Sequence, residues 1–276
     1  MREITSTANP VIRHLASLQH KAAVRRETGT FVIEGERLVL SAPAQYLREV
    51  YVTAAVWEHL SAQLTERISG DRITLLSDAA MAKVSDTKSP QGILAEALQP
   101  VWSPDDVIRT AVPAKTPSSD RERPALLLLL EDIQDPGNLG TMFRTAEAAG
   151  ASGLILTDRC ADIFNPKTVR STMSSIFRMP FVITGIPSSA TDLLSRSGIR
   201  TFAACPGADS ASFETQDYSG PCAFLIGNEG NGLRRETIQA ADQSISIPMQ
   251  GRIESLNAAM SAGILLYEAA RQRGYQ

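Results

Sequence analysis

Three stretches of the sequence combine glycine with amide, carboxylate or guanidinium side chains, as ligand-binding loops do. The first, "DPGNLGTMFRTAEAAG" (135–150), offers Gly137 for a tight turn, Asn138 as a helix N-cap and Arg144 within the helix that follows. A helix N-terminus attracts anions, and an arginine near it can hold a phosphate or stabilise an oxyanion. Many ordinary turns before helices share this composition, so a turn without a chemical role is the alternative.

The second stretch, "LIGNEGNGL" (225–233), places one amide, Asn228, and one carboxylate, Glu229, in a glycine loop after an apolar run. Its glycines follow G-x-x-G-x-G, the reverse of the dinucleotide-binding pattern, and the chain has no G-x-x-x-x-G-K-[ST] phosphate loop. The sequence therefore does not support a Rossmann or P-loop enzyme. A plain turn is again the alternative.

The third stretch, "SIPMQGRIESLNAAMSAGILLYEAARQR" (246–273), ends in an amphipathic helix expected from about 256 to 272, with Ser255 as its N-cap. The apolar face of this helix predicts packing in the core or against a second subunit, and consists of Leu256, Ala259, Met260, Gly263, Ile264 and Tyr267. Before the helix, the apolar tripeptide 247–249 contains a proline, which has no backbone donor. Free backbone groups beside apolar side chains suit a flat ligand such as adenine.

Histidine chemistry is excluded from the C-terminal half, because His14, His20 and His59 all lie in the first quarter of the chain. That half therefore contains neither a Ser-His-Asp triad nor a histidine-ligated metal. The three cysteines have no C-x-x-C spacing and are expected to be buried free thiols. We expect no metal centre.

The charge of the chain allows only a local contact with nucleic acid. The formal net charge is −3, whereas simple nucleic-acid-binding domains are basic. Residues 1–30 form a basic cluster in which Arg25 and Arg26 are candidates for RNA contact, although a solvated helix face has the same composition. The longest apolar run, 125–130, is far shorter than the roughly 20 residues of a membrane span, and no signal peptide is recognisable. We expect a cytoplasmic protein.

Strands and helices alternate after residue 124, which predicts an α/β domain with a parallel sheet. The expected strands are 125–130, 153–157, 180–183, 200–204, 222–226 and 244–247. The expected helices are 139–149, 166–177, 190–197, a short one near 233–240 and the final helix. Because ligands bind at the carboxyl ends of parallel strands, the three stretches should meet at that edge.

The N-terminal part, 1–99, predicts a smaller α/β domain. Its expected strands are 30–35, 49–53, 73–77 and 92–97, and its expected helices are 11–24, 36–47, 55–69 and 78–85. Residues 100–124 are rich in proline, serine, threonine and charge, and are expected to link this domain to a second one over 125–276.

Taken together, the three stretches resemble the three motifs of the SpoU/TrmH branch of the SPOUT RNA methyltransferases, in the family's order and approximate spacing. The resemblance covers 125–273. It implies a parallel-sheet α/β domain with a deep C-terminal trefoil knot, a homodimer, and methyl transfer from S-adenosylmethionine to a ribose 2′-hydroxyl. "FVIEGERLV" (31–39) is similar to the ribosomal-protein-L30-like substrate-binding domain of many of these enzymes.

The resemblance also implies roles for individual residues. Arg144 matches the principal catalytic residue, and the other polar positions around the reacting groups are Asn138, Glu229, Ser255 and Asn257. The cofactor would be held largely through backbone by Gly227, Ile247 and Leu256, with Ile226 and Met249 nearby. Ser174 stands where relatives often have glycine. RNA contacts could come from Lys167, Arg170 and Arg178, for which a solvated helix face is an equal alternative.

Ribosomal RNA is the favoured substrate, because the L30-like domain is unusual in the family's transfer-RNA enzymes. Transfer RNA is the alternative within this class. A catalytically silent RNA-binding factor is a different class, against which the presence of Arg144, Glu229 and Asn257 argues. A nucleotide-binding regulator or oxidoreductase is disfavoured by the missing dinucleotide fingerprint.

Overall fold

The computed structural model describes residues 2–108, 111–113, 122–185, 187–207 and 210–274. The chain divides into two compact units: unit 1 comprises 1–101 with 162–177, and unit 2 comprises 102–161 with 178–276. The sequence predicted a first domain over 1–99, a linker over 100–124 and a second domain over 125–276. Residues 162–177, expected in the C-terminal domain, pack instead with unit 1.

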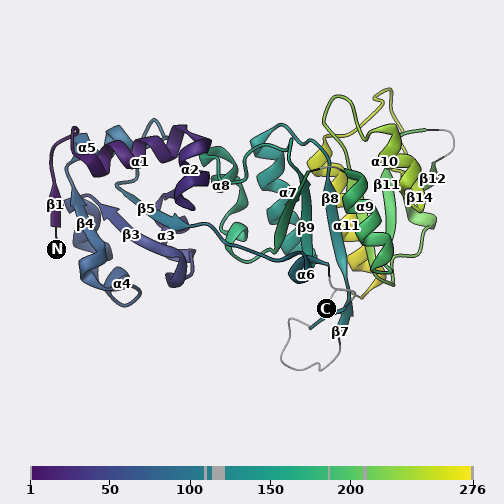
Figure 1. The fold of residues 1–276 in the computed structure, drawn as a ribbon, viewed down its shortest axis with the longest axis horizontal. Helices are drawn as coiled ribbons and strands as arrows, with labels where there is room; N and C mark the ends of the chain where they lie inside the picture. The colour runs from purple at the N-terminus through teal and green to yellow at the C-terminus, as the bar shows by residue number, and fades with distance from the viewer. Residues whose placement is uncertain (1, 109–110, 114–121, 186, 208–209, 275–276) are drawn as a thin grey trace. The chain divides into compact units, whose positions relative to one another are not determined.

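Unit 1 is built on a five-stranded mixed sheet in the order β1-β4-β3-β5-β2 (Figure 1). Its strands are β1 (Arg2–Ile4), β2 (Thr30–Glu34), β3 (Leu47–Val52), β4 (Ile73–Leu76) and β5 (Ile93–Leu98). Its helices are α1 (Pro10–His20), α2 (Ala22–Thr28), α3 (Glu36–Ser41), α4 (Ala54–Thr65), α5 (Asp78–Val84) and α8 (Pro166–Thr172). The apolar sides of α1 and α5 form one core with β2, β4 and β5.

Two expected helices of unit 1 are shorter than their periodicity indicated. The helix predicted over 11–24 is interrupted at Lys21, whose backbone is extended, so that α1 and α2 are separate. The helix predicted over 36–47 ends at Ser41, because Pro43 follows and disfavours helical backbone before it.

Residues 162–177 contact the rest of unit 1 through aromatic rings as well as through ion pairs. The ring of Phe31 lies 4.9 Å from that of Phe164 and 5.8 Å from that of Phe177. The predicted helix over 166–177 ends at Thr172, because Met173 and Ser174 adopt left-handed backbone with φ of 50° and 72°. Such a φ at Ser174 fits a position where glycine is favoured.

Unit 2 contains a seven-stranded, entirely parallel sheet in the order β10-β9-β8-β13-β11-β14-β12 (Figure 1). Its strands are β8 (Leu126–Leu130), β9 (Gly153–Thr157), β10 (Phe181–Thr184), β11 (Arg200–Ala204), β12 (Ala211–Ser212), β13 (Cys222–Ile226) and β14 (Gln243–Ser246). This arrangement confirms the predicted α/β fold with a parallel sheet.

Helices cover both faces of this sheet, which explains why β8, β9 and β13 are buried along their whole length. One face packs against α6 (Pro104–Val107), α9 (Pro187–Arg196) and α10 (Arg235–Ala240). On the other, α11 (Ala258–Gln272) packs against α7 (Pro136–Ala148), β8 and β13.

The stretch expected to be a linker is partly ordered in the described residues. Ser103 caps α6 through a reciprocal pair of hydrogen bonds with Asp106, and Val107 is buried in the core of unit 2. Two short strands, β6 (Ala111–Pro113) and β7 (Glu122–Pro124), pair antiparallel. The rest of the predicted linker, 109–110 and 114–121, lies outside the described residues.

Candidate active site

The loops that follow β8 and β13 lie side by side, because these strands are neighbours with Leu130 opposite Ile226. We call residues 131–135 the β8 loop and residues 227–233 the glycine loop. The carboxylate of Glu229 accepts hydrogen bonds from the backbone amides of Gln134 and Asp135, each at 3.1 Å. The two loops are thus connected at the edge where the sequence predicted a site.

Asn138 and Asn257 extend this contact to the third predicted stretch. The side-chain amide of Asn138 donates to Glu229 Oε1 at 3.0 Å, and its oxygen accepts from the amide of Asn257 at 3.0 Å. Three of the predicted residues, from segments far apart in sequence, therefore form one hydrogen-bonded chain.

The helix caps differ from those predicted, and the difference frees Asn138 for this contact. The N-cap of α7 is Asp135, whose carboxylate accepts from the Asn138 backbone at 2.8 Å, with Pro136 in the first turn. The N-cap of α11 is Asn257, which accepts from the amides of Ala259 and Met260 at 2.9 and 3.2 Å. The predicted caps, Asn138 and Ser255, are wrong by two or three positions.

The environment of Glu229 keeps its carboxylate ionised. Partial burial raises its pKa, but hydrogen bonds from Asn138 and from the backbone of Gln134 and Asp135 outweigh this and hold the pKa below its ordinary value. Because several donors already occupy its oxygens, Glu229 is better suited to holding Asn138 than to accepting a proton.

Arg144 and Ser255 are not part of the hydrogen-bonded chain. Arg144 lies on α7 about 9 Å along the axis from Asn138. Its guanidinium is exposed and makes no hydrogen bond or ion pair with the residues that the structure describes. Ser255 is also exposed, in the segment before α11. Both side chains are accessible from solvent.

Most of the predicted cofactor residues lie at the ends of β13 and β14, the two strands that flank β11, whereas Leu256 lies directly before the N-cap of α11. Ile226 is buried, whereas Ile247, Met249 and Leu256 are half-buried. A methyl group at Gly227 would lie 2.1 Å from the carbonyl carbon of Gly232, so the glycine loop closes here only around a glycine.

The backbone of 247–256 is available for a ligand. Within the described part of the chain, its amides and carbonyls form no backbone hydrogen bonds. Free backbone groups beside half-buried apolar side chains fit a purine that needs both stacking and edge hydrogen bonds. The residues present therefore fit a nucleoside-containing cofactor.

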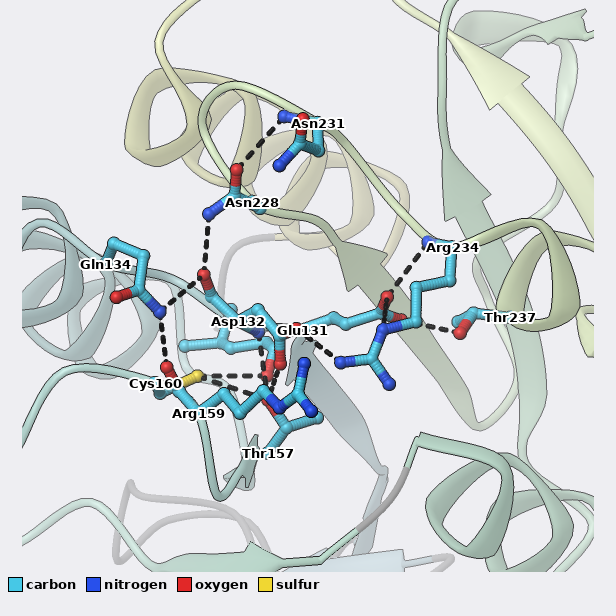
Figure 2. Close-up of polar contacts among 11 residues, drawn as sticks. Glu131, Asp132, Gln134, Thr157, Arg159, Cys160, Asn228, Asn231, Arg234 and Thr237 are labelled. Atoms are coloured by element: carbon cyan, nitrogen blue, oxygen red, sulfur yellow. Dashed lines mark hydrogen bonds and ion pairs between the residues drawn. The ribbon is translucent and has the colours of Figure 1, made fainter.

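Sequence reasoning missed a second polar cluster beneath the glycine loop (Figure 2). Glu131 and Asp132, the first residues after β8, both face Arg234, and the hydrogen bond to Asp132 raises the pKa of the Arg234 guanidinium. Two adjacent carboxylates directly after a buried apolar strand were the signal that could have revealed this cluster.

The predicted RNA-binding arginines have different environments. Arg25 is buried, and its guanidinium donates to the carbonyls of Leu18 and Gln19 and to Asp162. These bonds satisfy the carboxyl end of α1 and leave Arg25 only 3% exposed, which favours a structural role over the predicted RNA contact. Arg26 is exposed, and its contact with RNA stays a prediction.

The three basic residues predicted between 167 and 178 also differ in their exposure and partners. Lys167 is exposed, whereas Arg170 pairs with Asp86 at 2.8 Å. Arg178 donates two hydrogen bonds to Glu147, at 2.5 and 2.9 Å, which raise its pKa. To contact an RNA phosphate, Arg170 and Arg178 would have to share their guanidinium groups between the phosphate and these carboxylates.

Among the described residues, no group of three or more histidine, cysteine, aspartate or glutamate side chains is arranged to hold a metal ion. The helices in this part of the chain are all too short or too polar to cross a membrane.

Comparison with known proteins assigns both parts of the chain. Residues 125–267 match the SpoU rRNA Methylase family, and residues 9–95 match the MRM3-like substrate binding domain. A 23S rRNA (guanosine(2553)-2′-O)-methyltransferase of Bacillus subtilis is 33% identical, over 97% of this chain and 98% of its own. A 23S rRNA (uridine(2479)-2′-O)-methyltransferase of Streptomyces viridochromogenes is 30% identical, over 99% and 93%.

A solved structure extends the likeness to three dimensions. The AdoMet-bound rRNA methyltransferase of Sinorhizobium meliloti is 32% identical and superimposes with a TM-score of 0.80, over 98% of this chain and 97% of its own. The shared fold, the matched motifs and the full-length relatives agree. The chain belongs to the SpoU rRNA methylase family.

Proposed function

We propose that this protein transfers a methyl group from S-adenosylmethionine to a ribose 2′-hydroxyl of ribosomal RNA. The observation that carries the proposal is the chain Glu229–Asn138–Asn257, which joins three loops beside the free backbone of 247–256. The relatives named above support the reaction, and they differ in the nucleotide they modify, guanosine in one and uridine in the other. The nucleotide is therefore not part of the proposal.

The chemistry requires alignment more than acid or base strength. S-adenosylmethionine supplies a methyl group already activated by the positive sulfur. Holding the ribose oxygen in line with that methyl group can lower the barrier by about 7–11 kcal/mol. The described loops provide the fixed backbone for this task, with Gly227, Ile247 and Leu256 holding the cofactor and Ile226 and Met249 beside it.

We assign the charge-stabilising role to Arg144. Its free guanidinium can hold an RNA phosphate or stabilise the oxyanion that forms as the hydroxyl loses its proton. A guanidinium is a poor proton acceptor, and the carboxylate of Glu229 is occupied by Asn138, so the hydroxyl proton would pass to water or to an RNA phosphate oxygen. The exposed hydroxyl of Ser255 and the amide of Asn257 complete the polar surface toward the ribose.

RNA would be bound by unit 1 together with exposed basic residues. The match of 9–95 to a substrate binding domain supports this assignment. Arg26 and Lys167 are exposed and are the first candidates for phosphate contacts. Action on ribosomal RNA would place the protein in the cytoplasm.

A homodimer is also part of the proposal. Met260 and Tyr267 on α11 are 60% and 43% exposed, and Ile264 lies between them on the same side of the helix. This stripe is the part of the predicted apolar face that does not enter the core of unit 2. A second subunit is the partner that the family resemblance implies for it.

The implied trefoil knot remains a proposal as well. After β14, near one edge of the sheet, α11 returns to the central strands β8 and β13. Its end is fixed there by Arg273, which donates to the carbonyls of Pro124, Tyr218 and Gly220 at 2.6–2.8 Å. Such a return is what a threaded C-terminal segment requires.

The decisive experiment deletes the gene and maps 2′-O-methylation over all stable RNAs. We expect one ribosomal mark to disappear, and to return with the wild-type gene but not with Arg144→Ala. A lost mark on transfer RNA would correct the substrate. An unchanged map would contradict the enzymatic function.

A further inference from the structure

The polar cluster beneath the glycine loop joins that loop to the β8 loop through one arginine (Figure 2). Arg234 immediately follows the glycine loop. Its backbone amide donates to Glu131 Oε1 at 2.9 Å, and its Nε lies 3.5 Å from the same oxygen. Its Nη2 donates to Asp132 Oδ2. Two consecutive carboxylates thus bind one guanidinium.

Glu131 is the most buried member of this cluster. The Glu131 side chain is 1% exposed, and its second oxygen accepts from Thr237 at 2.5 Å. A buried carboxylate is costly unless charge and hydrogen bonds compensate it, and Arg234, whose own side chain is 37% exposed, supplies this compensation together with Thr237. The start of α10 is fixed by the same contacts.

In the β8 loop, both the backbone and the side chain of Asp132 are hydrogen-bonded to Thr157. Its backbone is left-handed, with φ of 55°. Thr157 accepts from its amide at 2.9 Å and donates to its Oδ1 at 2.7 Å. A non-glycine residue in this conformation persists only where its surroundings determine it.

The other end of the glycine loop is attached to the same residue. The amide of Asn228 donates to the Asp132 carbonyl at 2.9 Å, and its oxygen accepts from the backbone of Gly230 and Asn231, each at 3.0 Å. Glu229 lies between these two attachments. Its position relative to Asn138 therefore depends on both.

We propose that Asp132 and Arg234 are positioning residues for methyl transfer, and that their ion pair fixes the glycine loop so that Glu229 orients Asn138. This inference rests on the proposed function. Neither residue needs to touch the substrate. A purely structural role would make the pair matter for stability but not for turnover by the folded enzyme.

Two variants test the pair with little change in shape. Arg234→Gln removes the charged fork, and Asp132→Asn removes the charge while retaining an oxygen for Thr157 and tolerance of left-handed backbone. We expect kcat of the folded enzyme to fall about 10- to 100-fold, as for small misplacements of reacting groups. KM for RNA should stay within about twofold, because unit 1 is unchanged. Arg234→Lys should recover part of kcat, since it keeps the charge but not the fork.

A matched control removes an exposed arginine contact elsewhere in unit 2. Arg196 donates to the carbonyl of Asp192 on the same helix, α9, and Arg196→Gln should leave kcat unchanged. The double variant Asp132→Asn, Arg234→Gln should be no slower than the slower single variant, because both remove one interaction. Independent, multiplying losses would contradict a shared role.

Hydrogen exchange provides a readout that does not depend on catalysis. The amides of Gln134 and Asp135 donate to Glu229, so Arg234→Gln should accelerate their exchange while leaving the central strands protected. Unchanged exchange, or normal kcat in Arg234→Gln when the wild type methylates RNA, would overturn the inference and leave the proposed function intact. Absence of methylation by the wild type would instead defeat the proposed function, and the catalytic role of the pair with it.

Discussion

The side-chain amide of Asn257 donates a hydrogen bond to the side-chain oxygen of Asn138 at 3.0 Å, across 119 residues of sequence. Asn257 is at the same time the N-cap of α11, and Asn138 donates to Glu229. One asparagine therefore fixes the start of the last helix and the orientation of a polar group at the proposed site. A 180° flip of the Asn138 side-chain amide would break its hydrogen bonds to both Glu229 and Asn257.

Asn257→Asp should separate these two tasks. Aspartate caps a helix as well as asparagine does, so we expect stability to change by less than about 0.5 kcal/mol. The carboxylate cannot donate to Asn138 and would face its oxygen, so methyl transfer should fall at least about tenfold. Chemical denaturation and initial rates with labelled cofactor measure the two effects. Asn257→Ala, which also loses the cap, should cost about 1 kcal/mol in addition. Normal turnover by Asn257→Asp would show that the contact with Asn138 is dispensable.

Gly227→Ala should distort the backbone of the glycine loop. The added methyl group would lie 2.1 Å from the carbonyl carbon of Gly232 and 2.2 Å from the amide nitrogen of Leu233, so the backbone must move. Forced overpacking of this kind costs about 1–3 kcal/mol, and cofactor binding measured by calorimetry should weaken strongly. Gly230→Ala is the control, because its nearest neighbour is 3.6 Å away. Equal cofactor affinity in the two variants would contradict the proposed role of Gly227 in the glycine loop.

The contribution of Glu229 to stability should depend on pH with a defined sign. Its folded-state pKa lies below the ordinary value of 4.5, so the stabilisation is complete above about pH 4.5 and is lost as the pH falls through the folded-state pKa. Glu229→Gln should be less stable than the wild type at pH 7, and the difference should shrink below pH 4.5. Urea unfolding across this range measures it. A difference that grew toward acid pH would mean that the folded protein raises this pKa.

Met260→Glu should disrupt the proposed homodimer without unfolding unit 2. Its side chain is 60% exposed, so a charge there is tolerated in a single subunit but not against an apolar partner surface. Light scattering should show a dimer for the wild type and a shift toward monomer for the variant. Ile183→Glu alters a residue that is 57% exposed on β10 and should stay dimeric. A monomeric wild type would remove the basis of this proposal.

Local sequence patterns determined the parallel sheet and the three loops. Strands β9, β11 and β13 lie where alternation of apolar runs and turns predicted them, because buried strands covered by helices need continuous apolar residues. Glycine and polar residues directly after such strands were enough to predict the edge of the sheet that carries the site. The family resemblance added the roles, which periodicity alone does not contain.

Helix ends were less well determined, because capping depends on which side chain reaches the free amides. Ser255 and Asn138 were plausible caps by residue type, yet Asn257 and Asp135 have the required geometry. Charge patterns were ambiguous for a similar reason. Arg25 and Arg26 are adjacent and identical, but only Arg25 turns into the core to meet the carbonyls at the end of α1.

The sequence by itself determined which residue types stand at the carboxyl ends of the strands, and hence the class of chemistry that they allow. Only the tertiary structure decided how they connect. Asn138 and Glu229 are 91 residues apart, and Arg234 and Asp132 are 102 apart. No local spacing encodes such pairs, because they form only once a parallel sheet brings distant strand ends to one edge and burial removes water as the competing partner.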